Sequence, residues 1–383
     1  MTNFLWFIKK MAVFFAAKRG ALFNIPVEKQ KGFLEKLPEP KNDWERSFYQ
    51  YKCQMFLKGR IFAIILNIIS MFAYLPLYLL YKRKSLNKSG RQINNIFLNH
   101  GLSIDTVPKE LQDELNEIKT VTLGDIIYIS EEDKDFLKEI RKKYPFSWHF
   151  HLKLLIKVAQ YRSLIDEYRP KVMIVCSEYS FTSSILTDYL SRKGIEHINV
   201  QHGENFYFIE RSFFRFHRCY LWNQRYVDLF AALRAEQKQF RIAIPRSLKF
   251  DTQLSVSKEY DYTYYLGYNP KWQLKLIHEN LLELQNKGMK ISVRPHPRYS
   301  NNKYVKEIFH DMNIEMPREV DIKLSVLRTK HAVSLYSVVL QQAYENNVKV
   351  VIDDVTDSKK YLKIKELEYS LLETEHQLLS ELT

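Results

Sequence analysis

The sequence predicts an α/β protein with two doubly wound domains that follow a basic, apolar segment. From residue 92 onward, short β-rich runs alternate with segments whose apolar residues recur at helical spacing. This alternation lapses over residues 246–258 and then begins again, which indicates a linker between two similar domains. A chain of 383 residues, 46% of them apolar, is long enough to bury two cores.

The first domain is expected over residues 92–245. Apolar residues recur at helical spacing over 150–168, where Arg169 and Pro170 end the predicted helix. The apolar run 172–176 (VMIVC) is typical of a parallel strand that is buried on both faces. The other elements expected here are strands at 96–98, 120–129, 197–200 and 219–222 and a helix at 183–192.

The second domain is expected over residues 259–383. Its pattern predicts strands at 262–266, 290–293, 332–335 and 348–352. Helices are expected at 272–286, 322–328 and 338–346 and over the last twenty-odd residues. Because strand–helix–strand units join parallel strands by right-handed crossovers, each domain should be Rossmann-like, with the two halves facing across a cleft.

The region 1–91 is expected to associate with a membrane. It holds 17 Lys and Arg against 5 Asp and Glu, a net charge of +12, whereas the whole chain has +14. The apolar run 61–81 is long enough to span a bilayer, but Pro76 interrupts it and basic residues flank both ends. These flanks favour a helix lying in the interface of an anionic membrane. A spanning helix and a buried core helix are the alternatives.

Several function classes are disfavoured by what the sequence lacks. It holds none of the motifs typical of dinucleotide-binding dehydrogenases, P-loop ATPases, zinc proteases or α/β-hydrolases. Its three cysteines are scattered, which argues against a disulfide framework and a zinc site. The acidic triplet Asp133-Lys134-Asp135 suits the first turn of a helix better than a metal site. We therefore expect no metal ion and no cofactor.

Three loops that follow predicted strands carry the candidate functional residues, because ligands of doubly wound sheets bind at the carboxyl ends of the strands. The first loop, residues 200–205 (VQHGEN), offers His202 and Glu204 as candidate general bases. Gly203 allows a tight turn or the close approach of a ligand, and Asn205 follows in the same loop. The alternative role for His202 is a hydrogen bond to a loop carbonyl.

The second loop, residues 293–298 (VRPHPR), leaves a buried strand and is stiffened by two prolines. His296 lies between these prolines, with Arg294 and Arg298 beside it. A rigid loop with one imidazole and two guanidinium groups suits the binding of a phosphate group.

The third loop, residues 334–340 (SLYSVVL), leads from a predicted strand into a helix. Ser337 could cap that helix, which is a purely structural role. The same helix N-terminus could also bind a phosphate group through its backbone N–H groups.

Taken together, in this order and at these separations, the three motifs resemble those of the GT-B glycosyltransferases of bacterial surface polysaccharide synthesis. That group includes capsule-synthesis enzymes, sialyl- and polysialyltransferases, and the CDP-glycerol glycerophosphotransferases of teichoic-acid synthesis. The resemblance covers about residues 95–370.

The resemblance implies a donor site in the second domain. His296 with Ser334 and Ser337 would hold the donor nucleotide, and Arg294 with Arg298 would support its phosphate groups. Gln342 stands where such helices often place a ribose-binding glutamate, so Gln341 or Gln342 would bind the ribose more weakly or differently. The identity of the donor therefore stays open.

The resemblance also implies an acceptor side in the first domain. His202 or Glu204 would act as the base toward the acceptor hydroxyl, and Gly203 and Asn205 would lie on the acceptor side. Glu178, in the loop after the predicted strand 172–176, is a further acidic candidate.

The implied reaction is inverting, metal-independent transfer from a CMP- or other nucleotide-activated sugar to a surface glycan, capsule or lipid-linked acceptor. The basic segment would place the protein at the cytoplasmic face of the membrane, peripherally or by a single anchor. The alternatives are a CDP-glycerol-type glycerophosphotransferase and a non-catalytic, membrane-tethered module that binds nucleotide sugars or polyanions. A nucleic-acid binder is disfavoured because the positive charge gathers around an apolar segment.

Overall fold

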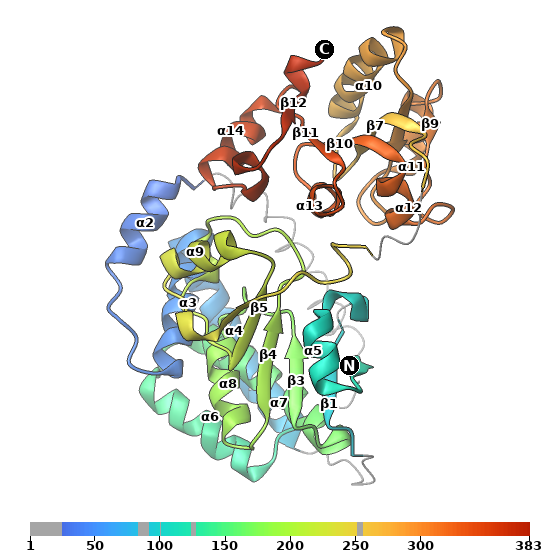
Figure 1. Cartoon of the computed structure of the whole chain (residues 1–383). Helices are drawn as coiled ribbons and strands as arrows, with labels where there is room; N and C mark the ends of the chain where they lie inside the picture. The colour runs from blue at the N-terminus through green and yellow to red at the C-terminus, as the bar shows by residue number, and fades with distance from the viewer. Residues whose placement is uncertain (1–24, 83–91, 100, 124–127, 251–255) are drawn as a thin grey trace. The chain divides into compact units, whose positions relative to one another are not determined.

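The computed structural model describes residues 25–82, 92–99, 101–123, 128–250 and 256–383 (Figure 1). The chain divides into two compact units: Met1–Gln201 with Tyr207–Ala243, and His202–Phe206 with Ile244–Thr383. The helices of region 1–91 thus count with the first unit instead of forming a region of their own, and the short loop 202–206 counts with the second. The expected linker 246–258 lies partly outside the described residues.

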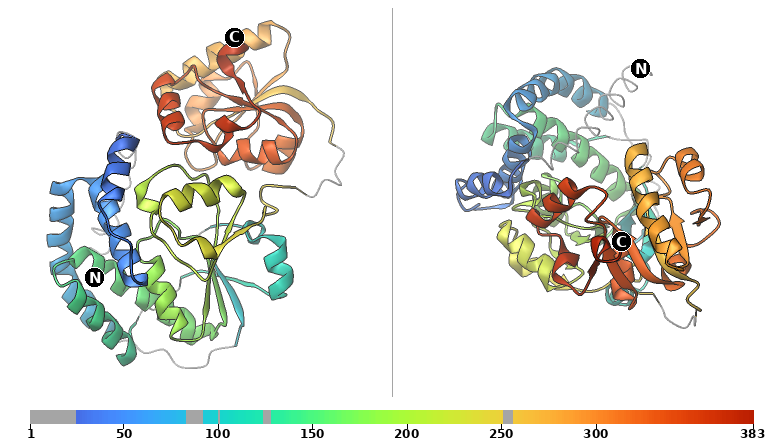
Figure 2. Two further views of the ribbon diagram at one scale, coloured as in Figure 1. Left: turned by 60° about the vertical axis from the view of Figure 1, so that its left-hand side comes forward. Right: turned by 90° about the horizontal axis from the view of Figure 1, so that it is seen from above.

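The first unit contains a six-stranded parallel sheet in the order β2-β1-β3-β4-β5-β6. Its strands are β1 (Asn95–Leu98), β2 (Lys119–Val121), β3 (Val172–Val175), β4 (Glu196–Val200), β5 (Arg218–Leu221) and β6 (Phe240–Ile242). The helices between them are α5 (Lys109–Leu115), α6 (Glu131–Lys143), α7 (Trp148–Tyr168), α8 (Ser183–Ser191) and α9 (Gln224–Ala232). Helix α5 covers one face of the sheet, where Leu111 packs with Phe97 and Ile174, while α7 and α8 lie on the opposite face (Figures 1 and 2).

Three helices precede this sheet: α2 (Val27–Glu35), α3 (Asp43–Lys58) and α4 (Arg60–Lys82). Helix α3 packs on α8, where Trp44 Nε1 donates a hydrogen bond to Asp188 Oδ2 at 2.8 Å. Helix α4 packs along α7 and runs through Pro76 without a break. Pro76 therefore lies inside one continuous helix.

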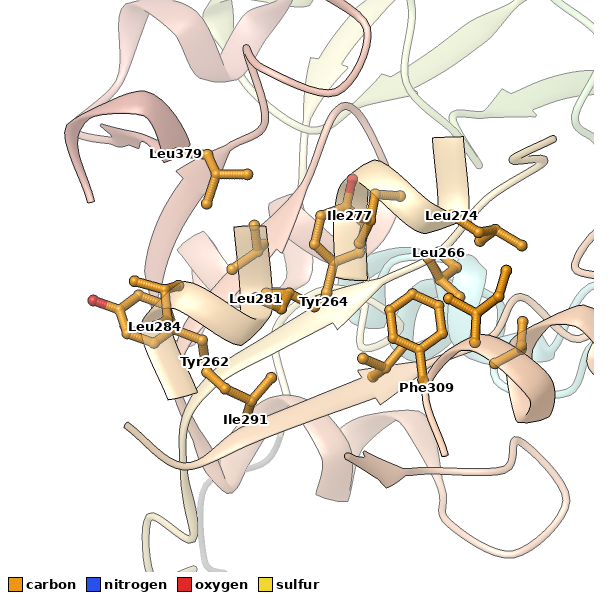
Figure 3. Close-up of a cluster of buried hydrophobic side chains, with 14 of the residues drawn as sticks. Tyr262, Tyr264, Leu266, Leu274, Ile277, Leu281, Leu284, Ile291, Phe309 and Leu379 are labelled. Atoms are coloured by element: carbon orange, nitrogen blue, oxygen red, sulfur yellow. The ribbon is translucent and has the colours of Figure 1, made fainter. Parts of the chain in front are cut away.

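The second unit contains another six-stranded parallel sheet, in the order β12-β11-β10-β7-β8-β9. Its strands are β7 (Tyr260–Tyr265), β8 (Ile291–Arg294), β9 (Asn313–Ile314), β10 (Thr329–Ser334), β11 (Lys349–Ile352) and β12 (Gln377–Leu378). Its helices are α10 (Lys271–Asn286), α11 (Asn302–Ile308), α12 (Ile322–Leu327), α13 (Val338–Glu345) and α14 (Ser358–Glu366). Ile277 and Leu281 of α10 fill the core over Tyr264 and Val293 of the sheet (Figure 3).

Two expected elements differ from the structure. The predicted strand 120–129 is only β2, and residues 124–127 lie outside the described residues. The predicted final helix is wrong: Glu368 takes a left-handed conformation (φ 61°), and two 3₁₀ turns and β12 follow it. Tyr369 and Leu371 are buried, so packing of these turns replaces a continuous helix.

The acidic triplet at residue 133 begins a helix, as expected. Ser130 and Asp133 form a capping box at the start of α6. The carboxylate of Asp133 is also buried and accepts hydrogen bonds from Arg162 Nε and Nη2 at 2.8 and 2.9 Å. This ion pair keeps the pKa of Asp133 below its ordinary value despite burial, which by itself would raise it.

Candidate functional site

The strand order indicates where each sheet should bind a ligand. Doubly wound sheets bind ligands outside the carboxyl ends of their strands, at the point where the strand order reverses. In the second unit this point lies between β7 and β10, and in the first unit between β1 and β3. The loops after these strands are therefore the first places to look for functional groups.

Hydrogen bonds join three strand ends of the second unit at its reversal point. At the end of β10, Ser334 Oγ donates to the carbonyl oxygen of Tyr265 on β7 at 2.9 Å. Ser300 Oγ donates to the carbonyl oxygen of Gly267, just after β7, at 3.1 Å, and accepts from the backbone N–H of His296 at 2.8 Å. The carboxyl ends of β7 and β10 and the loops after β7 and β8 are therefore hydrogen-bonded to one another.

The geometry of His296 fixes how its neutral ring can bind. Its Nδ1 accepts a hydrogen bond from the backbone N–H of Arg298 at 3.0 Å, which leaves the ring proton on Nε2. The ring stacks on Tyr299, with 4.4 Å between centroids. Burial, and next the charge of Arg298, lower the pKa of His296. At neutral pH the side chain is thus a neutral N–H donor, which suits a phosphate oxygen.

Ser337 caps α13, because its Oγ accepts a hydrogen bond from the backbone N–H of Val339 at 3.2 Å. Beside it, the ammonium of Lys360 lies 4.9 Å from the ring centroid of Tyr336. The start of α13 therefore combines backbone N–H donors with a nearby cation, and both favour an anion.

The loop 202–206 packs within the second unit. Ser370 Oγ donates to Glu204 Oε2 at 3.1 Å, and the ring of Phe206 meets that of Tyr336 edge to face at 5.7 Å. Asn205 is buried and donates to the carbonyl oxygen of Gly203 at 3.1 Å, so its side chain shapes the loop. His202 is half-buried.

Three expected donor residues have structural partners instead of open positions. Arg294 is 6% exposed; its Nη2 donates to the carbonyl oxygen of Val320 at 2.8 Å, and its Nη1 lies 3.8 Å from Glu315 Oε2. Burial lowers the pKa of Arg294, and Glu315 opposes that shift. Val320 and Glu315 thus hold the guanidinium group of Arg294 beside β8, and its expected part in phosphate binding stays a prediction.

The other two are Ser334 and Gln342. Ser334 is buried in its bond to β7, and Gln342 Nε2 donates to the carbonyl oxygen of Ser247 at 2.7 Å, where it holds the incoming chain. These bonds use the hydroxyl proton of Ser334 and one of the two amide N–H groups of Gln342, so the ribose contact expected of Gln342 stays a prediction. Arg298 is exposed, as a phosphate-binding side chain should be.

In the first unit, Glu178 lies at the reversal point after β3. It is 2% exposed, and its Oε2 accepts a hydrogen bond from Asn199 Nδ2 at 3.3 Å. Asn199 Oδ1 in turn accepts from the backbone N–H of Ser177 at 2.7 Å. Gln50 of α3 donates to the carbonyl oxygen of Glu178 at 3.0 Å. Asn199 thus orients the buried carboxylate of Glu178, and Gln50 holds the backbone of the same residue.

Sequence reasoning missed a row of buried polar side chains along β4, formed by His197, Asn199 and Gln201. Thr187 Oγ1 lies 2.8 Å from His197 Nδ1, and Gln201 Oε1 accepts from the backbone N–H of Trp222 at 3.2 Å. The signal was present in the sequence, because polar residues alternate with apolar ones through HINVQ at the two-residue period of a strand.

No metal site is formed by the described part of the chain: no three His, Cys, Asp or Glu side chains gather there in a group that could hold an ion. All three cysteines are buried as free thiols. In the first unit, a surface depression of about 520 Å³ lies away from the carboxyl edge of the sheet, by α3 and the ends of α6 and α8. Its charged groups largely pair with one another, as in the ion pair of Asp43 and Arg215.

No family model matches the sequence, and no curated protein matches it. Solved structures align with it at low identity. The UDP-GlcNAc 2-epimerase of Neisseria meningitidis, bound to UDP-GlcNAc, covers 71% of this chain and 85% of its own, with 11% identity and a TM-score of 0.43. The calicheamicin glycosyltransferase CalG4 covers 73% and 83%, with 10% identity and a TM-score of 0.42. Anabaena HepE in complex with UDP-glucose covers 70% and 82%, with 12% identity and a TM-score of 0.42. The structural neighbours thus include glycosyltransferases and UDP-GlcNAc 2-epimerases, at a similarity too low to assign a family.

Proposed function

We propose that the protein is a glycosyltransferase that moves a sugar from a nucleotide-activated donor to an acceptor hydroxyl. The observation that carries this proposal is the joining of three strand ends in the second unit, where Ser300 and Ser334 tie together the carboxyl ends of β7 and β10 and the loops after β7 and β8. This is the position at which doubly wound sheets bind nucleotides. The Nε2–H of His296 and the first N–H groups of α13 would bind the phosphate groups there.

The proposed transfer is a single displacement with inversion. A base removes the proton of the acceptor hydroxyl, whose oxygen bonds to the anomeric carbon while the bond from that carbon to the phosphate oxygen breaks. The nucleotide leaves with the electron pair, and His296 with the α13 N-terminus stabilises its charge. Glu204 is the first candidate for the base, because Ser370 holds its carboxylate in the unit that also holds His296. His202 and Glu178 are the other candidates, and no metal ion takes part in this scheme.

The acceptor we propose is a surface glycan or capsule chain, free or lipid-linked, at the cytoplasmic face of the cell membrane. The basic, apolar region 1–91 supports this location, because it offers both charge and apolar surface to a membrane. A lipid-linked acceptor would then be presented in the same plane as the enzyme.

Calorimetric titration of the full chain with UDP, CMP, CDP and GDP tests the donor site. We expect one of these nucleotides to bind, and His296→Ala to weaken its binding about tenfold or more, as loss of a hydrogen bond to a charged group does. The matched control is His310→Ala, an exposed histidine after α11, at the opposite edge of the same sheet. Failure of all four nucleotides to bind, or equal binding by the His296 variant, would contradict the proposal.

Turnover is tested separately, by release of the nucleotide from its activated sugar in the presence of acceptor glycan. We expect Glu204→Gln to lower the rate about 10²- to 10⁴-fold without loss of donor binding. Donor binding with no turnover by the unmodified protein would support the non-catalytic binding module instead. Binding of CDP with turnover of CDP-glycerol would support glycerophosphate transfer.

A further inference from the structure

Helix α4 attaches to the first unit by one face. Asn67 Nδ2 donates a hydrogen bond to the carbonyl oxygen of Phe146 at 2.9 Å, and Asn67 Oδ1 accepts one from the backbone N–H of His149 at 3.1 Å. On the same helix Ser70 is 1% exposed and Tyr74 is 5% exposed. These contacts hold α4 against α7 in one orientation.

The opposite face of α4 is a long exposed apolar surface. Ile61 is 76% exposed, Phe72 is 71% exposed and Leu75 is 60% exposed. These positions recur every three or four residues along one side of the helix, together with the exposed side chains of Ile64, Ile65, Ile68, Ile69, Met71, Leu79 and Leu80. Contiguous apolar surface of this extent is typical of a site that contacts a membrane or another protein.

The charge around α4 identifies which of these partners fits. Residues 46–104 contain nine Lys and Arg and no Asp or Glu. Lys58 and Arg60 are exposed at the start of α4, and the sequence after Tyr81 continues with Lys-Arg-Lys. A partner must therefore be apolar along α4 and negatively charged at both ends, and an anionic lipid surface meets both requirements.

The attachment to α7 also decides how α4 can meet the lipid. The segment Arg60–Tyr81 is long and apolar enough to cross a membrane. A crossing helix, however, would place the Asn67 face in hydrocarbon, together with the backbone groups of Phe146 and His149 to which it is bonded, where unsatisfied polar groups are costly. A helix in the plane of the membrane inserts only its exposed face and keeps these hydrogen bonds.

We propose that α4 lies in the plane of an anionic membrane, with its exposed apolar face inserted at the boundary of headgroups and acyl chains. Its other face stays on α7, and the exposed Lys58 and Arg60 at its start contact lipid phosphates. This proposal is independent of the proposed sugar transfer, because a protein without a donor site would bind vesicles in the same way.

Co-sedimentation of the full chain with phosphatidylcholine vesicles, with or without phosphatidylglycerol, tests the partner. We expect binding to the anionic vesicles, weakened by added salt, and reduced more than tenfold by the double substitution Phe72→Ser and Leu75→Ser. The matched control is Leu362→Ser, which removes a leucine that is 63% exposed on α14 of the second unit. Circular dichroism and the urea midpoint check that the variants are folded. Equal binding to neutral vesicles, or by the double variant, would overturn the proposal.

Fluorescent labels at three positions test the orientation. Ile65→Cys, Phe72→Cys and Leu79→Cys place single thiols along the exposed face, while the native cysteines are buried. We expect quenching by spin-labelled lipids to report one shallow depth at all three positions. A label at position 72 that lies far deeper than the other two would show a crossing helix. Labels already shielded from water without vesicles would show that another segment or a second copy covers this face. Either result would contradict the in-plane proposal.

Discussion

In the second unit two candidate ligand-binding groups lie in half-exposed loops, whereas in the first unit the candidate carboxylate and its partner are buried. His296 and Ser337 are half-buried, and their strongest contacts are within their own loops. Glu178 and Asn199 are almost fully buried and bonded across strands. The comparison suggests that substitutions at the first pair should change ligand binding with little effect on folding. Substitutions in the interior of the first unit should mainly lower its free energy of unfolding.

The largest expected difference between the units comes from removing one member of a buried ion pair in the first unit. We expect Arg162→Leu to lower the free energy of unfolding of the first unit by about 3–5 kcal/mol, because the fully buried carboxylate of Asp133 would lose its charged partner. Urea denaturation measures this loss. The control is Lys271→Ala in the second unit, which removes an exposed ion pair with Glu307 and should show no measurable loss. Equal losses in both variants would contradict the comparison.

A second prediction concerns Glu178. We expect Glu178→Ala to cost about 1–3 kcal/mol, because the Asn199 amide would keep its burial and lose its acceptor. Glu178→Gln keeps the shape of the side chain and should cost less, and the urea midpoints of the two variants measure the difference. If Glu178→Gln were to abolish turnover while folding stayed intact, Glu178 would replace Glu204 as the proposed base.

The sequence predicts features with a local pattern, but it does not predict contacts between residues that are distant along the chain. The apolar run 172–176 and the helix 150–168 were predicted correctly, because burial on both faces and helical spacing leave strong local patterns. The three loops were rightly placed after strands. The partners of Arg294 and Gln342 could not be predicted, since Val320 and Ser247 are distant in sequence and only the folded sheet brings them close.

The next prediction compares how the stability of the two units depends on pH. Burial lowers the pKa of both His197 and His149 to about 3, against about 6.5 in an unfolded chain. The unfolded state therefore binds more protons below pH 6.5, and this part of the stability is complete above pH 6.5 and lost as the pH falls toward 3. In this window each histidine should lower the free energy of unfolding by about 1.4 kcal/mol for every unit by which the pH falls.

Urea midpoints between pH 6.5 and 4.5 measure this effect before most carboxylates titrate. His197→Gln should reduce the dependence on pH in the first unit. His296→Gln should change it little, because the His296 ring is only half-buried. A dependence that is the same in the unmodified protein and in the His197 variant would show that this histidine does not titrate as its burial implies.

The smallest expected effect concerns the pH dependence of donor binding. Because burial and the charge of Arg298 lower the pKa of His296 below its ordinary value, the ring is neutral at and above pH 7. The neutral ring still donates through Nε2, since Nδ1 accepts the backbone N–H of Arg298. Nucleotide affinity measured by calorimetry should therefore stay constant between pH 7 and about pH 9, where the phosphate is already fully ionised. An affinity that falls tenfold per pH unit as the pH rises would show that binding requires the imidazolium, and that the tautomer assigned from the loop geometry is not the form that meets the donor.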